Sequence, residues 1–163
     1  MNNDNIKLEN MTEEERDLHF MRLALDAARR AAERDEVPVG ALVVHDGEPL
    51  TVGENRREGD RMATHHAEVL AIEEACRVLG GWRLPRCTLY VTLEPCPMCA
   101  GAIVNSRIDR VVFGAYDARA GAFGSVTDLT ELPLNHKPQI VGGVLADECA
   151  EILREYFRAK RKN

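Results

Sequence analysis

Residues 88–106 read TLYVTLEPCPMCAGAIVNS, and they contain the strongest secondary-structure signals of the chain. Thr88–Leu93 is an apolar and β-branched run of the kind that forms a buried strand. Glu94-Pro95 ends the run. Cys96-Pro97 then opens a helix that we expect to continue to about Ser106, because proline is favoured in the first turn of a helix. A buried strand that leads into a helix predicts a sheet covered by helices.

The segments before this stretch predict a helix and a hairpin. Apolar residues at spacings of three and four begin after Thr12, which forms a capping box with Glu15, and the helix should stop before Val37-Pro38. Asp46-Gly47 is a dipeptide favoured in tight hairpin turns. We expect strands on either side of it, at Val39–Val44 and Leu50–Gly53.

The remaining segments continue the alternation of strands and helices. They are a helix from about Thr64 to Leu79 that ends at Gly80-Gly81, a short strand at Val111–Phe113, a weaker strand at Gln139–Val144 and a final helix at Ala146–Lys160. This order predicts an α/β fold, and the hairpin makes its central sheet mixed, not purely parallel.

Length and composition bound the class of protein. The chain has 163 residues and a mass of 18.2 kDa, with 45% hydrophobic and 29% charged residues, which are ordinary values for one globular domain. No apolar run approaches the roughly 18 residues that span a bilayer, and no secretory signal is present, so we expect a cytoplasmic protein. We expect residues 1–10 to form a flexible N-terminal extension and residues 11–163 a single domain.

The charge is unevenly distributed along the chain. The net charge is −6, which taken alone disfavours nucleic acid and mildly favours a small-molecule substrate. Residues 151–163, however, carry five basic and two acidic side chains, so this end is +3 and residues 1–150 are −9. Any contact with nucleic acid is therefore expected to be local.

Two short segments carry the chemistry, His65-His66-Ala67-Glu68 and Pro95-Cys96-Pro97-Met98-Cys99. Cys96 and Cys99 share one face of a first helical turn, where the helix dipole favours thiolates. With His66 they make three zinc ligands, which leaves the fourth tetrahedral position for a water molecule. Glu68 beside that water could take its proton and deliver it to a leaving group. The pattern predicts hydrolytic attack on an electrophilic carbon.

Three other interpretations compete with this one. A thioredoxin-like redox pair would use Cys-x-x-Cys but has no use for the upstream His-x-Glu. A structural zinc site needs a fourth ligand and leaves Glu68 idle; the available ligands are His65, Cys87 and His136. His65 could replace His66, but the His-x-Glu spacing favours His66.

The other cysteines and aromatic residues have simpler interpretations. An odd count of five cysteines without an export signal indicates reduced thiols, so we expect buried apolar roles for Cys76, Cys87 and Cys149. We place Tyr90, Trp82 and Phe113 in the core or at its edge.

The combined pattern H-x-E…P-C-x-x-C resembles that of the zinc-dependent nucleoside and nucleobase deaminases. Within them, the chain resembles the bacterial tRNA-specific adenosine deaminases over about residues 15–160. The strings that carry this likeness are Val37–Ala41, Asn55-Arg56, Thr88–Cys96, Met98–Ala102, Arg110–Ala115 and Leu145–Ala150.

The resemblance implies a three-layer α/β/α fold around a five-stranded mixed sheet, in a homodimer with one Zn²⁺ per subunit and no organic cofactor. It implies deamination of adenosine to inosine at the wobble position of a tRNA anticodon stem-loop. Zinc-bound hydroxide would attack C6 of adenine, and Glu68 would protonate N1 and then the departing amino group. By position, Asn55, Ala67 and Asp117 would contact the substrate.

The chain departs from the family pattern at two places. His65 stands where a small residue is usual, and Tyr116 stands where a basic residue is expected, so RNA contact there would rely more on stacking. One rival function is deamination of a free base or nucleoside such as guanine or cytosine, which needs no basic C-terminal end. Another is a catalytically silent zinc-containing RNA-binding module, which would not need Glu68.

Overall fold

Five strands form one mixed sheet in the order β2-β1-β3-β4-β5 in this computed structural model, which describes residues 8–162. β1 pairs antiparallel with β2 and β3, whereas β3, β4 and β5 are parallel. The strands are β1 (Gly40–His45), β2 (Glu48–Glu54), β3 (Cys87–Leu93), β4 (Arg110–Ala115) and β5 (Gln139–Val141).

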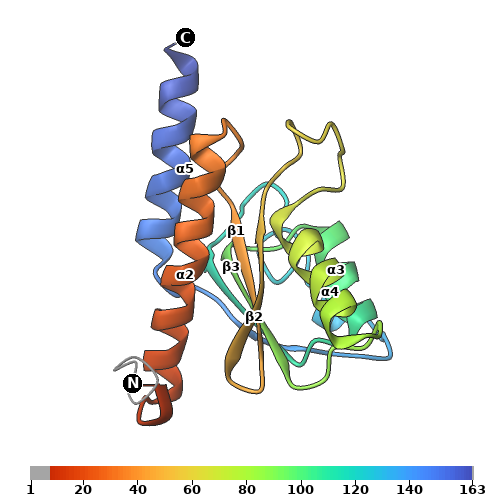
Figure 1. The fold of residues 1–163 in the computed structure, drawn as a ribbon. Helices are drawn as coiled ribbons and strands as arrows, with labels where there is room; N and C mark the ends of the chain where they lie inside the picture. Colours follow the sequence, from red (N-terminus) through yellow and green to blue (C-terminus); the bar gives the residue numbers. More distant parts are fainter. Residues whose placement is uncertain (1–7, 163) are drawn as a thin grey trace.

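Helices cover both faces of this sheet, so the expected three-layer α/β/α fold is confirmed (Figure 1). α2 and α5 lie on one face, and α3 and α4 lie on the other. The helices are α2 (Glu13–Glu33), α3 (Ala67–Leu79), α4 (Pro97–Ser106) and α5 (Ala146–Arg161), with a short 3₁₀ turn η1 (Leu129–Glu131) that sequence patterns did not predict. Within residues 8–162, no helix combines the length and the apolar character needed to cross a membrane.

Two apolar clusters, one on each face of the sheet, form the core. On β1, Ala41 and Val43 belong to the cluster that includes α3 residues, whereas Leu42 and Val44 belong to the cluster that includes α2 residues. This alternation is the two-residue period of a strand. Because both faces are covered, the central strands read as nearly continuous apolar runs in the sequence.

The predicted capping box and the predicted hairpin turn are both confirmed. The Thr12 hydroxyl accepts a hydrogen bond from Glu15 N at 3.1 Å, and the Glu15 carboxylate accepts one from Thr12 N at 3.1 Å, so the capping box starts α2. Asp46 and Gly47 both have positive φ, 50° and 79°, as the tight hairpin turn requires. The expected extension over residues 1–10 lies mostly outside the described residues, but Leu8 packs against the core.

Other expectations need correction. The second helix begins at Ala67 instead of about Thr64, and β5 ends at Val141, since Gly143 takes a φ of 87° that no extended strand has. Trp82 is not a core residue, because its ring lies on the surface under the guanidinium of Arg83, 4.4 Å from the ring centroid. Tyr90 and Phe113 are buried as predicted.

The predicted burial of the three remaining cysteines holds for two of them. Cys87 and Cys149 are buried, whereas Cys76 is only partly buried. Cys76 lies in the last turn of α3, where its thiol contacts the carbonyl oxygen of Trp82 at 3.8 Å.

Candidate active site

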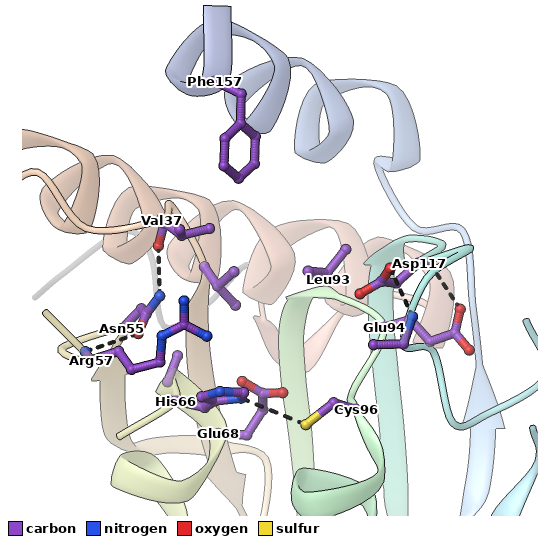
Figure 2. A pocket seen from close by; sticks show the side chains of 13 residues that line it. Val37, Asn55, Arg57, His66, Glu68, Leu93, Glu94, Cys96, Asp117 and Phe157 are labelled. Atoms are coloured by element: carbon purple, nitrogen blue, oxygen red, sulfur yellow. Dashed lines mark hydrogen bonds between the residues drawn. The ribbon is translucent and has the colours of Figure 1, made fainter. Parts of the chain in front are cut away.

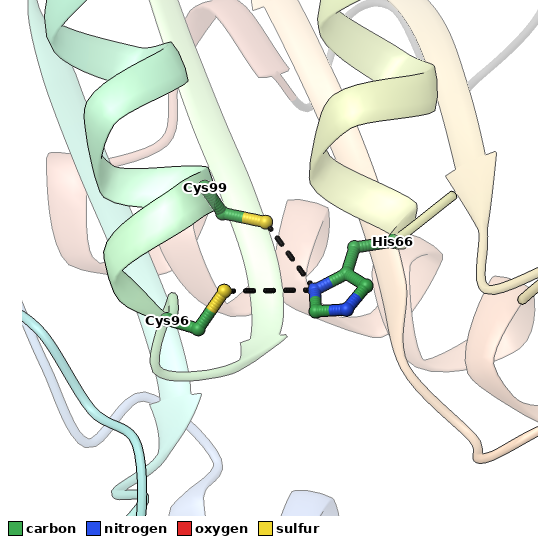
Figure 3. A group of neighbouring side chains, drawn as sticks. All are labelled: His66, Cys96 and Cys99. Atoms are coloured by element: carbon green, nitrogen blue, oxygen red, sulfur yellow. Dashed lines mark hydrogen bonds between the residues drawn. The ribbon is translucent and has the colours of Figure 1, made fainter. Parts of the chain in front are cut away.

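The N-termini of α3 and α4 meet at the candidate active site (Figure 3). His66 is the N-cap residue of α3 and Cys96 is the N-cap residue of α4. Both have extended backbone, and neither side chain caps its own helix, so both project beyond the helix ends. His66 and Glu68 are two residues apart, and residues two apart within a helix do not lie on the same face. The N-cap position of His66 removes that difficulty.

His66, Cys96 and Cys99 converge on one point in space. His66 Nδ1 lies 3.6 Å from Cys96 Sγ and 3.5 Å from Cys99 Sγ, and the three possible ligand atoms lie within 4.8 Å of one another. Tetrahedral zinc, with Zn–S of about 2.3 Å and Zn–N of about 2.0 Å, places sulfur and nitrogen about 3.5 Å apart. These three side chains therefore fit a zinc ion.

Hydrogen bonds within this group shift the pKa values of its members in opposite directions. A hydrogen bond from Cys99, together with one from His66, lowers the pKa of Cys96 to about 4, so Cys96 is a thiolate at neutral pH. Because the Cys99 thiol donates to the Cys96 thiolate, this hydrogen bond, together with burial, raises the pKa of Cys99. The hydrogen bond with Cys96 raises the pKa of His66. A cation that binds between these groups would displace their protons.

The residues considered as a fourth ligand lie elsewhere. His65 Nδ1 is 2.7 Å from the Asp60 carboxylate, and His136 Nε2 is 2.7 Å from the carbonyl oxygen of Ile108. Cys87 contacts His45 Nδ1 at 3.4 Å. Among residues 8–162 the group of possible metal ligands thus has three members, which is the number of a catalytic zinc site.

Glu68 lies in the first turn of α3 and is 4% exposed. Burial raises the pKa of its carboxyl group. The start of α3 is held against the sheet at Gly53 of β2, where a Cβ atom would lie 2.0 Å from the carbonyl oxygen of Ala67. Only glycine permits this close approach, which places His66 and Glu68 beside the strand ends.

One cavity of about 280 Å³ brings these residues together with the predicted substrate contacts (Figure 2). His66, Glu68 and Cys96 lie on one side of it, and Phe157 of α5 lies on the opposite side. We call it the active-site cavity; its lining is Val37, Val39, Asn55, Arg57, His66, Ala67, Glu68, Leu93, Glu94, Cys96, Asp117, Ala120 and Phe157.

Two of the predicted substrate contacts are already bonded to backbone. Asn55 donates from Nδ2 to the carbonyl oxygen of Val37 and accepts at Oδ1 from Arg57 N, both at 3.2 Å. Asp117 accepts at Oδ1 from Arg119 N at 3.0 Å and Ala120 N at 3.2 Å. Both residues line the cavity, and both amide and carboxylate keep further hydrogen-bonding capacity.

Glu94 is a buried residue that lines this cavity, and no sequence pattern identified it. Its carboxylate accepts hydrogen bonds from the backbone N–H groups of Asp117, Phe123 and Ser125, each at 3.1 Å, and from the Ser125 hydroxyl. Hydrogen bonds to this one carboxylate therefore hold the loop 117–125 in place. Sequence spacing holds no signal for this arrangement, because the partners are mainly backbone groups 23 to 31 residues away.

A second hollow adjoins the active-site cavity and shares Val37, Leu93, Asp117 and Phe157 with it. This hollow measures about 790 Å³ and lies between α5 and the loop that follows β4. We call it the basic groove, because its charged lining is dominated by Arg119, Arg154, Arg158, Lys160 and Arg161. Tyr116 lines the groove with an exposed ring.

Comparison with known protein families matches residues 15–161 to a model described as MafB19-like deaminase. Among curated relatives, a tRNA-specific adenosine deaminase of Bacillus subtilis (strain 168) is 49% identical over 144 residues, covering 88% of this chain and 89% of the relative. A tRNA-specific adenosine deaminase of Agrobacterium fabrum (strain C58 / ATCC 33970) is also 49% identical over 144 residues, covering 88% and 95%.

The solved structures that resemble this chain include deaminases as well. A structure from work on A-to-I editing by tRNA:A34 deaminases at the wobble position of transfer RNA superposes with a TM-score of 0.81, at 48% identity, over 83% of this chain and 99% of the other. A guanine deaminase from Nitrosomonas europaea superposes with a TM-score of 0.72, at 26% identity, over 96% and 93%.

Proposed function

The chain belongs to the family of the tRNA-specific adenosine deaminases, and from that membership we propose that it hydrolyses adenosine to inosine at the wobble position, 34, of a tRNA anticodon, with release of ammonia. The observation that carries the proposal is the convergence of His66, Cys96 and Cys99 beside buried Glu68, in a cavity that adjoins a basic groove.

His66, Cys96 and Cys99 are the residues that would hold zinc, one ion per chain. Zinc bound there would supply a nucleophile at neutral pH by lowering the pKa of a water molecule to about 7. Glu68 would take a proton from the attacking water molecule and give it to N1 of the adenine ring. It would then carry the second proton of that water, from the new C6 hydroxyl, to the departing amino group. Water adds at C6, the C6–N bond breaks, and ammonia leaves.

The remaining residues of the cavity bind and orient the base. Asn55 offers a donor and an acceptor to the edge of the ring, and its bonds to Val37 and Arg57 hold the amide in place. Ala67, at the start of α3, lines the same cavity, and its backbone would contact the ring. Asp117 contacts nucleotides that flank the target, because it lines both hollows.

A rival function is deamination of a free purine, which the likeness to the guanine deaminase favours. The basic groove supports RNA instead, because a polyanion bound in the groove would place one nucleotide in the cavity that adjoins it. A free base needs no such groove.

We further propose a homodimer located in the cytoplasm, where tRNA is modified. Exposed apolar side chains such as Trp82, Leu132 and Leu134 support an interface between copies. Light scattering should give twice the monomer mass of 18.2 kDa. A monomer at micromolar concentration would overturn the dimer and leave the chemistry untouched.

Zinc-loaded protein incubated with a full-length tRNA that carries adenosine at position 34 tests the function. Nuclease digestion and mass spectrometry should locate inosine at position 34 alone, and a tRNA with guanosine at that position should stay unchanged. Absence of inosine, or inosine spread over other adenosines, would contradict the proposal.

A further inference from the structure

We propose that Arg57 binds a phosphodiester group next to the target adenosine and so holds the RNA strand at the mouth of the active-site cavity. This inference rests on the proposed function, because it assigns to Arg57 a part of the same substrate. It adds a positioning residue that neither the metal-ligand pattern nor the substrate-contact positions identified.

The guanidinium of Arg57 lies at the cavity and forms no hydrogen bond or ion pair with the described residues. Its side chain lines the cavity beside Asn55 and lies above His66 (Figure 2). No acceptor within the described part of the chain takes a hydrogen bond from this guanidinium. By contrast, the nearby arginines Arg30 and Arg34 both bind the Glu54 carboxylate. Arg57 is therefore free to bind a ligand.

The backbone that carries Arg57 is held at several points. Arg57 N donates to Asn55 Oδ1 at 3.2 Å, and the Arg57 carbonyl oxygen accepts from Met62 N at 3.1 Å. The next two N–H groups, of Glu58 and Gly59, donate to the buried carboxylate of Glu36 at 3.1 and 2.6 Å. The turn is thus ordered before any ligand binds, which lowers the entropy cost of binding through Arg57.

The charges of the cavity lining identify the ligand class. Apart from the proposed metal ligand His66, Arg57 is the one basic side chain in that lining, whereas Glu68, Glu94 and Asp117 are acidic. An RNA strand that places a base beside Glu68 must bring its phosphates to the cavity mouth. A guanidinium binds phosphate oxygens through two parallel hydrogen bonds, and here it would offset the surrounding acidic groups.

A control lies in the same loop. Arg61 is exposed, does not line the cavity and has no ion pair with other described residues. Arg57→Gln and Arg61→Gln each remove one positive charge, so a general loss of attraction for RNA would affect both variants. A specific phosphate contact would affect Arg57→Gln alone, and Arg57→Lys should restore part of the loss.

The test uses zinc-loaded protein and anticodon stem-loops in single-turnover kinetics. On unmodified RNA, Arg57→Gln should raise the half-saturating RNA concentration on the order of 10-fold with little change in the maximal rate. The slope of log affinity against log salt should fall by about 0.7. Arg61→Gln should leave both quantities near the wild-type values.

Stem-loops with a neutral methylphosphonate on the 5′ or the 3′ side of the target then identify the phosphate. At the contacted linkage, the loss caused by Arg57→Gln should shrink to about 2-fold or less. A loss that persists with both modified RNAs, as expected if Arg57 stacked on a base, would overturn the inference, and so would no loss with unmodified RNA. Absence of inosine with the wild-type protein would instead overturn the proposed function.

Discussion

His66 and Cys96 serve one centre because each is the N-cap residue of its helix. The usual N-cap residues bond to their own helix, whereas these two side chains point at each other across the gap between α3 and α4. Cys99 completes the group from the first turn of α4. Zinc bound here would join the two helix starts and fix the position of Glu68.

Replacing one ligand should remove the metal. For Cys96→Ser we expect zinc affinity to fall more than about 100-fold, because a serine hydroxyl is a poor ligand and loss of even an outer partner costs 10- to 100-fold. Metal analysis of protein purified at limiting zinc gives the content per chain. Cys76→Ser, which changes a cysteine outside the site, should keep one zinc. Full occupancy in Cys96→Ser would contradict its role as a ligand.

Replacing the proposed proton carrier should leave the metal in place. Glu68→Gln preserves the shape of a buried side chain but cannot shuttle protons, so kcat should fall by about 10²- to 10⁴-fold. Zinc content and melting temperature should stay near the wild-type values. A zinc-loaded Glu68→Gln protein with wild-type turnover would show that Glu68 moves no proton in the reaction.

The metal ligands could be predicted from the sequence, whereas several cavity residues could not. Cys96, Cys99 and His66 follow a spacing that zinc chemistry imposes on the chain. Glu94 and Arg57 follow no such spacing. Glu94 accepts hydrogen bonds from backbone groups of a loop that is distant in the sequence. Arg57 was identified because its guanidinium lines the cavity and has no hydrogen-bond acceptor among the described residues. Phe157 reaches the cavity only because α5 lies over it in the fold.

Buried carboxylates hold the two loops beside the active-site cavity. Glu36, in the turn between α2 and β1, binds N–H groups of the loop after β2. Glu94, between β3 and α4, binds N–H groups of the loop after β4. Each carboxylate replaces the secondary-structure partners that these loop N–H groups lack, so the loops stay ordered near the substrate.

The end of β2 is tied to α2 through Glu54, and this tie should respond to acid. Burial of Glu54 opposes ionisation, but hydrogen bonds from Arg30 and Arg34 outweigh it and lower the pKa of the carboxyl group below 4.5. The stabilisation is therefore complete above that pH and is lost as the pH falls through the lowered pKa of the folded state.

Chemical denaturation at several pH values measures this contribution. At pH 7 we expect Glu54→Gln to lower the free energy of unfolding by about 1 kcal/mol. The difference from wild type should disappear as the pH falls below 4.5. Glu48→Gln, at the exposed start of the same strand, should have almost no effect at any pH. A difference for Glu54→Gln that stays constant with pH would contradict the ion pairs.

Helices and strands were predictable where local signals were complete. The capping box at Thr12 and the hairpin dipeptide at Asp46 each supply their own hydrogen bonds or turn geometry. The start of α3 was displaced because His66 takes an extended conformation suited to its place at the site. The turn η1 was not predicted because three residues are too few to show the apolar periodicity of a helix.

The net charge of −6 conceals a local basic surface. α5 brings Arg154, Arg158, Lys160 and Arg161 to the groove beside the active-site cavity, and Arg119 joins them from the loop after β4. Arg154 and Lys160 already pair with Glu151 and Asp35. We therefore assign the strongest attraction for phosphate groups to the remaining arginines.

Removing two of these charges should weaken RNA binding. For Arg158→Gln combined with Arg161→Gln, the salt slope of stem-loop binding should fall by about 1.4, because each phosphate contact on a single strand contributes about 0.7. Filter binding at several salt concentrations measures the slope. Arg16→Gln combined with Arg22→Gln on α2, outside the groove, also removes two charges and is the matched control. An unchanged slope in the double variant would place the RNA elsewhere.

Substrate competition tests whether the protein deaminates adenosine within RNA. Zinc-loaded protein receives an adenosine-34 anticodon stem-loop together with equimolar free adenosine, guanine and cytosine, and all products are quantified by mass spectrometry. We expect inosine in the stem-loop while the free compounds remain unchanged. Deamination of a free base or nucleoside, with adenosine 34 of the stem-loop unconverted, would contradict the proposed function.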